Sequence, residues 1–265
     1  MNAVPHVAPA PLHARWLVDR RHDLLSTVGG LGASLAQMAL HVLGGVSGPP
    51  LWWAWVLLLD GPHLFATVSR TYLDARERKT RARLLWGSLG WFAAGPAVFA
   101  ASVLAGQRWP FAVFVTLTSL VFWPSVSRRM DFLMFTVAVT AFHNVQYHGI
   151  VWFFHRNRYH AEGVDRSAFG WAPKVSQRFI VYALCGLAFT LAYRTLGCGM
   201  GVHPGCGAFD AKVALGGAGL TLRDLMEGFI WGFALHHYFL DQYIWRVRRD
   251  AGLNQDLKLG TAGLA

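Results

Sequence analysis

The chain has 265 residues, of which 54% are hydrophobic and only 14% are charged, and its mean hydropathy is +0.33. A soluble domain usually carries about 25% charged residues, so this composition argues against a soluble globular protein and favours an integral membrane protein. The formal net charge is +10, but no soluble basic module carries it, so nucleic acid is not an expected partner. We expect the basic residues to face anionic lipid on the cytoplasmic side of a bilayer.

The chain divides into a lead-in, one large domain and a tail. Residues 1–22 have no apolar core ahead of their charges and do not read as a signal peptide; we expect a disordered or interfacial segment, with the N-terminus cytoplasmic. Residues 23–250 form a single transmembrane helical domain, because no polar stretch in them is long enough to build a second core. Residues 251–265 are expected to be a flexible C-terminal tail.

Apolar runs of the length that crosses a bilayer, roughly 17–25 residues, follow one another through the large domain. They are Leu24–Val46, Leu51–Leu73, Leu84–Ala105, Phe111–Phe122, Asp131–Phe154, Ile180–Leu196 and Leu215–Trp245. Phe111–Phe122 is short and lies between two prolines, so it is either a tilted span or a re-entrant piece. The predicted fold class is therefore all-α: a polytopic integral membrane helical bundle with six or seven transmembrane helices.

Basic residues orient this bundle. The positive-inside rule places the segments Arg70–Arg83, Arg156–Arg178 and Arg246–Arg249 on the cytoplasmic side. The Gly- and Pro-rich loop between Cys198 and Cys206 is then outside, where a disulfide suits an oxidising compartment; a Cys/His metal loop with His203 is the alternative. Six spans with a re-entrant element keep all three basic segments inside, whereas seven spans place one of them outside.

Three of the apolar runs carry polar and ionisable groups near their middle, where such groups are costly in hydrocarbon and mark functional sites. In Leu57–Asp74, the side chains of Asp60, His63, Thr67 and Asp74 fall on one helical face, and Pro62 is expected to kink the helix and open room for a ligand. We predict one intramembrane metal centre. Its proposed core is His63, His143, His236 and His237, with Asp60, His148 and Asp241 as further ligands or supporting residues.

Imidazole with carboxylate suits iron, zinc, copper or manganese. The motifs of zinc proteases, serine hydrolases and nucleotide-binding loops are absent from the sequence. A plainer interpretation of the stripe in Leu57–Asp74 is a proton relay or a helix-packing face. His155 and His160, beside Arg156 and Arg158, are expected to be solvated interfacial histidines.

The central run also carries a resemblance. HNVQYH, from His143 to His148, resembles the HxxxxH box of integral-membrane non-haem iron enzymes of the desaturase and alkane-hydroxylase type, and HRNRYH repeats its spacing. The pair His236–His237 resembles the end of an HxxHH box, although Phe233 stands where the first histidine would be. Single histidines spread over several spans are also similar to the membrane β-carotene dioxygenases of the Brp/Blh type, which hold one iron by four histidines.

This resemblance implies O₂ activation by one or two non-haem iron ions on an apolar, lipid-soluble substrate, in some cases with an electron donor. The aromatic candidates to line a substrate pocket are Phe142, Trp152, Phe233 and Tyr238. Two other classes stay open. A haem-binding electron-transfer protein would use His63 with His143 or His236 as axial ligands. A metal or proton transporter would usually have broken helices in related halves, and Gly61–Pro62 is the single break evident in the sequence.

Overall fold

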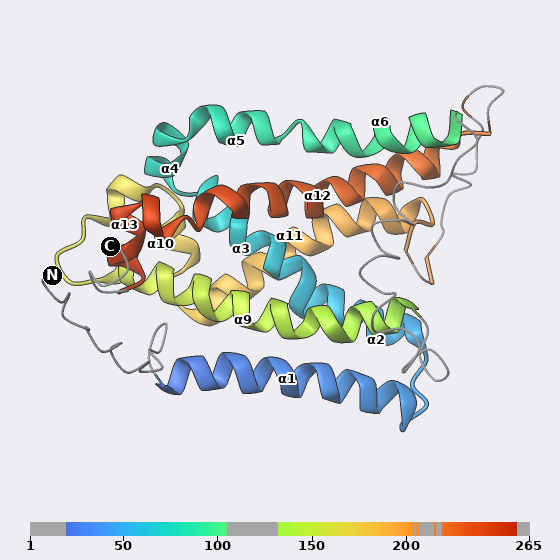
Figure 1. Ribbon diagram of the computed structural model, residues 1–265, viewed down its shortest axis with the longest axis horizontal. Coiled ribbons are helices and arrows are strands. Elements are labelled where there is room, and N and C mark those ends of the chain that lie inside the picture. The colour runs from blue at the N-terminus through green and yellow to red at the C-terminus, as the bar shows by residue number, and fades with distance from the viewer. Residues whose placement is uncertain (1–19, 105–131, 204, 207–214, 216–218, 259–265) are drawn as a thin grey trace, which may run out of the picture.

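The computed structural model describes residues 20–104, 132–203, 205–206, 215 and 219–258 (Figure 1). Every regular element among these residues is a helix, and an isolated antiparallel bridge joins Asp74 to Gly170. The all-α class predicted from the sequence is confirmed. The predicted Phe111–Phe122 element lies outside the described residues.

Long helical segments correspond to each of the other predicted apolar runs. They are α1 (Arg20–Val42), the continuous α2–η1–α3 (Gly48–Trp55, Val56–Asp60 and Gly61–Thr71), α5 and α6 (Ala82–Ser88 and Trp91–Leu104), α9 (Phe132–His160), α11 (Phe179–Gly199) and α12 (Leu222–Ile244). The short elements are α4 (Ala75–Thr80), η2 (Arg166–Phe169), α10 (Ala172–Val175), η3 (Val247–Arg249) and α13 (Ala251–Asp256).

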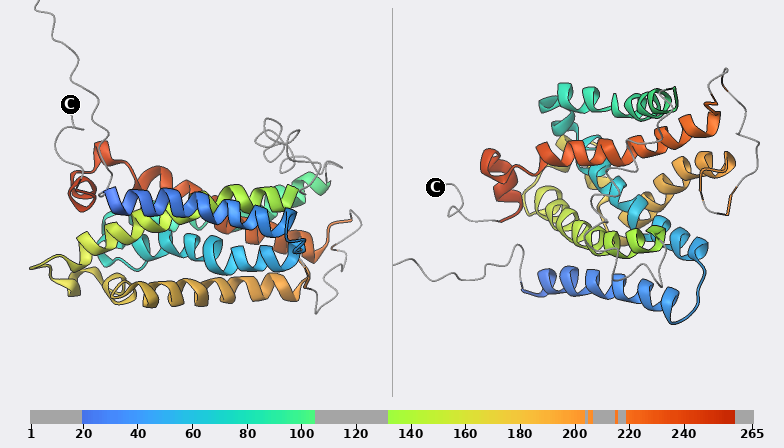
Figure 2. Two further views of the ribbon diagram at one scale, coloured as in Figure 1. Left: turned by 90° about the horizontal axis from the view of Figure 1, so that it is seen from below. Right: turned by 45° about the vertical axis from the view of Figure 1, so that its right-hand side comes forward.

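Helix α3 lies at the centre of the bundle and contacts α9, α11 and α12. Helix α1 packs along α9 on one side, and α6 packs along α12 on the other (Figure 1). Helix α11 runs along an outer edge of the bundle (Figure 2, left). Three helices therefore meet around α3, and this arrangement brings the polar groups of separate segments together.

Glycines allow two of these helix pairs to approach closely. A Cβ on Gly95 of α6 would lie 2.1 Å from the carbonyl oxygen of Gly228 on α12, and a Cβ on Gly61 would lie 2.1 Å from Thr190 Oγ1 on α11. Small residues at helix interfaces are typical of membrane bundles, where packing rather than the hydrophobic effect drives association.

The end of the bundle that carries α4 and α13 is held by ion pairs. The Arg158 guanidinium reaches Asp74 at 3.0 Å, Glu77 at 3.1 Å and Asp256 at 2.8 Å. Residues 251–256 were expected to belong to a flexible tail, yet they form α13, whose Leu253 is 2% exposed in a cluster with Phe154 and Tyr159. This part of the tail is packed because Asp256 pairs with Arg158 and Leu253 fills the core beside α9.

The opposite end carries the predicted disulfide. Cys198 and Cys206 are bonded, which confirms the pairing; the side of the membrane on which it lies stays a prediction. His203 of the closed loop contacts the rings of Trp52 and Trp53 at the start of α2, with centroids 5.1 and 5.9 Å apart. The loop thus covers the end of the central helix.

Two helical segments of the described chain are long and apolar enough to cross a membrane: Gly48–Thr71 and Phe179–Gly199. The first is largely enclosed by other helices, whereas the second exposes most of its side chains. Membrane association is thus supported at the level of two helices, and the fuller arrangement of six or seven spans is a proposal.

Candidate metal centre

Three of the predicted ligands converge at the middle of the bundle. His63 of α3, His143 of α9 and His237 of α12 place one ligand atom each within 4.8 Å of one another. The Nε2 atoms of His63 and His237 are 2.8 Å apart, and the ring centroids of His63 and His143 are 4.9 Å apart. Residues 63, 143 and 237 are remote in sequence, so the packing of α3, α9 and α12 is what creates the cluster.

The backbone before His63 departs from a regular α-helix. Residues Val56–Asp60 form a π-helical turn, and Gly61 and Pro62 follow it directly. Proline has no N–H to donate, and π turns inside helices are frequent at functional sites. The helix is thus irregular next to Pro62, as a π turn that ends immediately before Gly61, and His63 follows at the centre of the bundle.

A hydrogen-bonded chain fixes the His237 ring. Thr67 Oγ1 lies 2.7 Å from His237 Nδ1 and donates to Asp241 Oδ1 at 3.2 Å. The Tyr147 hydroxyl donates to the same Asp241 oxygen at 2.8 Å and accepts from Trp245 Nε1 at 3.2 Å. Since the Thr67 hydrogen is directed to the carboxylate, Thr67 accepts from the Nδ1–H of His237. His237 Nε2 therefore carries a lone pair directed at His63 Nε2, 2.8 Å away, which can accept a proton from that ring or bind a cation, as in the carboxylate-supported histidine ligands of metal sites.

The geometry of the cluster is close to that of a metal site. Metal–nitrogen bonds of about 2.1 Å separate two ligand nitrogens by at most about 4.2 Å, so three donors within 4.8 Å need only a small contraction to share one ion. His63 Nδ1 is buried without a hydrogen-bond partner among the described residues, and its Nε2 faces another imidazole nitrogen. Buried polar atoms are normally satisfied, so the unpaired Nδ1 of His63 leaves a nitrogen of this cluster available to a cation.

The site is closed on one side and open on the other. His63 and His237 are each 2% exposed, whereas His143 is exposed. Tyr238, which is 52% exposed, contacts the ring of His237 with centroids 5.1 Å apart. A ligand could therefore reach the cluster past His143 and Tyr238.

The other predicted ligands lie around the cluster or away from it. Asp241 lies at its edge, with Oδ2 3.6 Å from His237 Nε2. The His148 ring is 6.3 Å from that of His63, and its Nε2 is 3.2 Å from the Leu59 carbonyl oxygen. His236 is outside the cluster, because its Nε2 pairs with the Tyr72 hydroxyl at 2.9 Å and its ring packs on Phe92.

Asp60 is also outside the cluster: its carboxylate accepts from Arg194 of α11 at 3.1 Å. Arg194 was not among the predicted site residues, although an arginine inside the apolar run Ile180–Leu196 is a signal of a buried carboxylate partner. Thr67 was predicted to lie on the same helical face as His63, but neither Thr67 nor Tyr147 was predicted to orient His237.

One expectation about the periphery is wrong. His155 was expected to be solvated at the membrane surface, but it is 0% exposed. Its ring packs against Tyr159 and Tyr182, and its Nε2 is 3.4 Å from Ser69 Oγ. The helix turns His155 inward while its neighbour Arg156 faces outward, so adjacent positions in one polar run have opposite environments.

The aromatic residues expected to line a pocket are distributed over several faces. Phe233 stacks on Tyr193, with centroids 4.3 Å apart, and Trp152 packs edge-on against Phe179 at 5.4 Å. Phe142 faces Gly30 of α1. Tyr238 alone among the four contacts a histidine of the cluster in the part of the chain that the structure describes.

Comparison with known proteins gives no relative from which to transfer a function. No protein-family model matches the sequence, and neither a curated protein nor a solved structure matches it. The function must therefore be argued from the chemistry of the site.

Proposed function

We propose that the protein is an integral membrane oxidoreductase that uses a non-haem iron, held by His63, His143 and His237, to oxidise an apolar lipid-soluble substrate with O₂. The observation that carries this proposal is the convergence of three imidazoles from three helices within 4.8 Å. The set of ligands is smaller than the one predicted from the sequence, since His236 and Asp60 have other partners.

A metal accounts for this cluster better than a packing role does. Without a cation, His63 Nε2 can donate to His237 Nε2, but His63 Nδ1 then keeps a lone pair that has no partner among the described residues. Thr67 and Asp241 hold the Nδ1 proton of His237 away from the cluster, which is the tautomer that a metal ligand at Nε2 requires.

Iron is favoured by two features. Three protein nitrogens leave coordination positions open for O₂, and the HNVQYH run resembles the boxes of membrane iron oxygenases. Bound iron would supply the activation of O₂. Cleavage of a C=C bond places both oxygen atoms in two carbonyl products, whereas hydroxylation of a C–H bond also takes two electrons and two protons from a donor and releases water. Zinc and copper also bind imidazole and are distinguished by metal analysis.

The residues of the chain have distinct roles in this proposal. Asp241 and Tyr147 fix Thr67, Thr67 orients His237, and the exposed side of His143 admits substrate from the lipid. The remaining long helices would cross the bilayer together with the two that are apolar enough on their own, giving six crossings. The carboxylate of Asp60 would be neutralised inside the bundle by Arg194.

The haem alternative fits the geometry less well. Two axial histidines lie on opposite faces of a haem. The ring centroids of His63 and His143 are only 4.9 Å apart, which leaves too little room for a haem between them. His236, the other axial candidate, is engaged by Tyr72. A transporter would use the same polar cluster but would exchange its metal rapidly.

Elemental analysis of detergent-purified, iron-loaded protein tests the proposal, with His63→Ala, His143→Ala and His237→Ala compared with His236→Ala. His236 is the matched control because it is buried on the same helix, next to His237, and outside the cluster. We expect about one iron per chain in the wild type and in His236→Ala, and at least tenfold less in the other three variants.

Several results would contradict the proposal. They are an absence of metal in the iron-loaded wild type, equal loss in His236→Ala and His237→Ala, stoichiometric zinc or copper in place of iron, a Soret band, or exchange of the metal within minutes. Each variant must show the helical content of the wild type by circular dichroism.

A further inference from the structure

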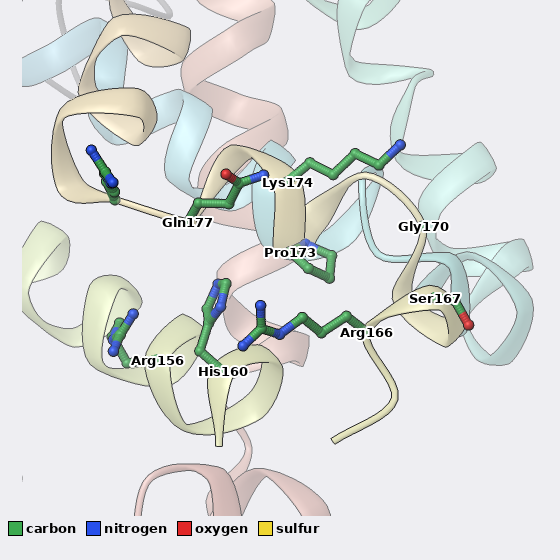
Figure 3. A pocket seen from close by; sticks show the side chains of 9 residues that line it. Arg156, His160, Arg166, Ser167, Gly170, Pro173, Lys174 and Gln177 are labelled. Carbon is green, nitrogen blue, oxygen red and sulfur yellow. The ribbon is translucent and has the colours of Figure 1, made fainter. Parts of the chain in front are cut away.

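A second site lies at the basic end of the bundle, remote from the histidine cluster. A pocket of about 380 Å³ opens between the end of α9, the η2–α10 connection and the start of α11 (Figure 3). Its charged and polar lining includes Arg156, His160, Arg166, Lys174, Gln177 and Arg178, and no carboxylate of the described residues lines it. His160 follows His143 by seventeen residues on α9, which is a separation of about 25 Å along a helix.

The arginines and the lysine of this pocket have no counter-ion among the described residues. Arg156, Arg166, Lys174 and Arg178 have no carboxylate of the described residues within 4.0 Å, whereas two other arginines at the same end, Arg81 and Arg158, are paired with carboxylates. Arg158 alone contacts three carboxylates, and Arg81 contacts Glu77 and Asp250. Cations gathered around a concave surface repel one another, and an anion between them would relieve this repulsion.

The side chains around the pocket are arranged to receive such an anion. Arg166 extends toward His160, while Arg156 stands beside His160 on α9 (Figure 3). His160 is held by a 3.1 Å contact between its Nε2 and Ser176 Oγ. Burial lowers the pKa of His160, and the positive charges of Arg156 and Arg166 lower it further.

The surroundings indicate a lipid rather than a dissolved ion. Arg178 directly precedes α11, one of the two helices able to cross a membrane. The first outward side chains of α11, Phe179, Ile180 and Leu184, are 57%, 60% and 56% exposed. Trp171, 61% exposed beside the pocket, is the type of residue enriched at the membrane interface. A headgroup in the pocket would thus have an apolar helix face beside it for its acyl chains.

We propose that this pocket binds the phosphate of an anionic phospholipid headgroup at the cytoplasmic face of the membrane, with the acyl chains lying along the exposed side of α11. Basic pockets between membrane helices on this side recognise such headgroups through charge-assisted hydrogen bonds. The site is independent of the metal centre and of the reaction proposed for it.

Binding of short-chain phosphatidic acid to the full chain in detergent tests the proposal, with short-chain phosphatidylcholine and inorganic phosphate as comparison ligands. Arg156→Gln/Arg166→Gln removes two pocket charges. Lys79→Gln/Arg83→Gln removes two exposed charges at the same end, outside the pocket. All four residues are exposed, so neither change should disturb the fold, and unchanged metal content provides a check.

We expect one saturable phosphatidic acid per chain, bound at least about tenfold more tightly than phosphatidylcholine or inorganic phosphate. The pocket variant should bind it at least about tenfold more weakly and the control variant less than about twofold more weakly. Equal losses in the two variants would show diffuse attraction and overturn the pocket. Equal affinity for phosphatidylcholine would overturn headgroup recognition, and equal affinity for inorganic phosphate would overturn the lipid assignment.

Discussion

Adjacent residues on a helix point about 100° apart, and His236 and His237 illustrate the consequence. The His237 ring turns toward His63, with the two Nε2 atoms 2.8 Å apart, while the His236 ring turns toward Tyr72 and Phe92. The pattern of the sequence indicated that polar groups in a buried span need partners, and both histidines have them. It could not show which of the two faces the centre, because that depends on how α12 is rotated against α3.

Thr67 provides the sharpest prediction at this scale. Replacement by valine keeps the shape but removes the acceptor for His237 Nδ1, so the ring loses its fixed orientation. Loss of such a supporting group typically lowers metal affinity 10- to 100-fold, and we expect that range for Thr67→Val in chelator-competition measurements. Asp241→Asn should act in the same direction, because it removes the charge to which Thr67 and Tyr147 donate.

Thr71→Val is the control for Thr67→Val. Thr71 is equally buried one turn further along α3, but its hydroxyl donates to the Thr67 carbonyl oxygen at 2.7 Å and contacts no histidine. Thr71→Val should lose about 1 kcal/mol of stability from its one removed hydrogen bond. Thr67→Val should lose more, because Thr67 Oγ1 contacts His237, Asp241 and Tyr147. The interpretation of Thr67 fails if the two variants weaken metal binding equally.

At the scale of the element, α3 shows where helical spacing stops being a guide. Asp60, His63, Thr67 and Asp74 were predicted to form one stripe, and His63 and Thr67 do share the site. Asp60 belongs to the π turn, where α-helical spacing does not hold, and it pairs with Arg194. Asp74 lies beyond the end of α3 and caps α4 by accepting from the N–H groups of Arg76 and Glu77.

The contact between α6 and α12 provides a second prediction. A Cβ on Gly228 would lie 2.8 Å from both Gly95 C and Pro96 N, which are backbone atoms that cannot rotate away. Gly228→Ala should therefore separate the two helices and cost about 1–3 kcal/mol, the usual penalty of overpacking. Unfolding of the purified protein in mixed detergent micelles measures this cost.

Gly32→Ala is the matched change inside α1, where nothing lies within 4 Å of the added Cβ. Alanine has the higher helix propensity, so this variant should gain up to about 1 kcal/mol. Equal stability of the Gly228 and Gly32 variants would mean that α6 does not pack on α12 through these glycines.

Across the whole molecule, composition and hydropathy predicted the helical class, the positions of the long helices and the Cys198–Cys206 bond. These depend on local composition and short spacing, and each leaves a signal in the sequence. Which histidines form the cluster depends on contacts between α3, α9 and α12, and the sequence of one helix alone does not reveal these contacts. The basic segment Arg70–Arg83 shows the same limit, since Arg81 is committed to ion pairs with Glu77 and Asp250, and whether its other cations bind the membrane surface stays a prediction.

The two ends of the bundle lead to the last prediction, which concerns orientation. Ser47 precedes α2 at the end of the bundle with the disulfide loop, where Gly205 approaches Pro49. Lys79 lies in α4 at the other end, where Arg158 and Arg81 form ion pairs that link α4, α9 and α13.

If the basic end is cytoplasmic, a cysteine at position 47 reacts with an impermeant maleimide added to intact cells, and one at position 79 reacts only after lysis. The variants Ser47→Cys and Lys79→Cys, made with Cys185→Ala so that the sole other cysteines are those in the disulfide, measure this directly. Labelling of position 79 alone in intact cells would reverse the orientation, and labelling of both would contradict a bundle whose ends lie on opposite sides of the membrane.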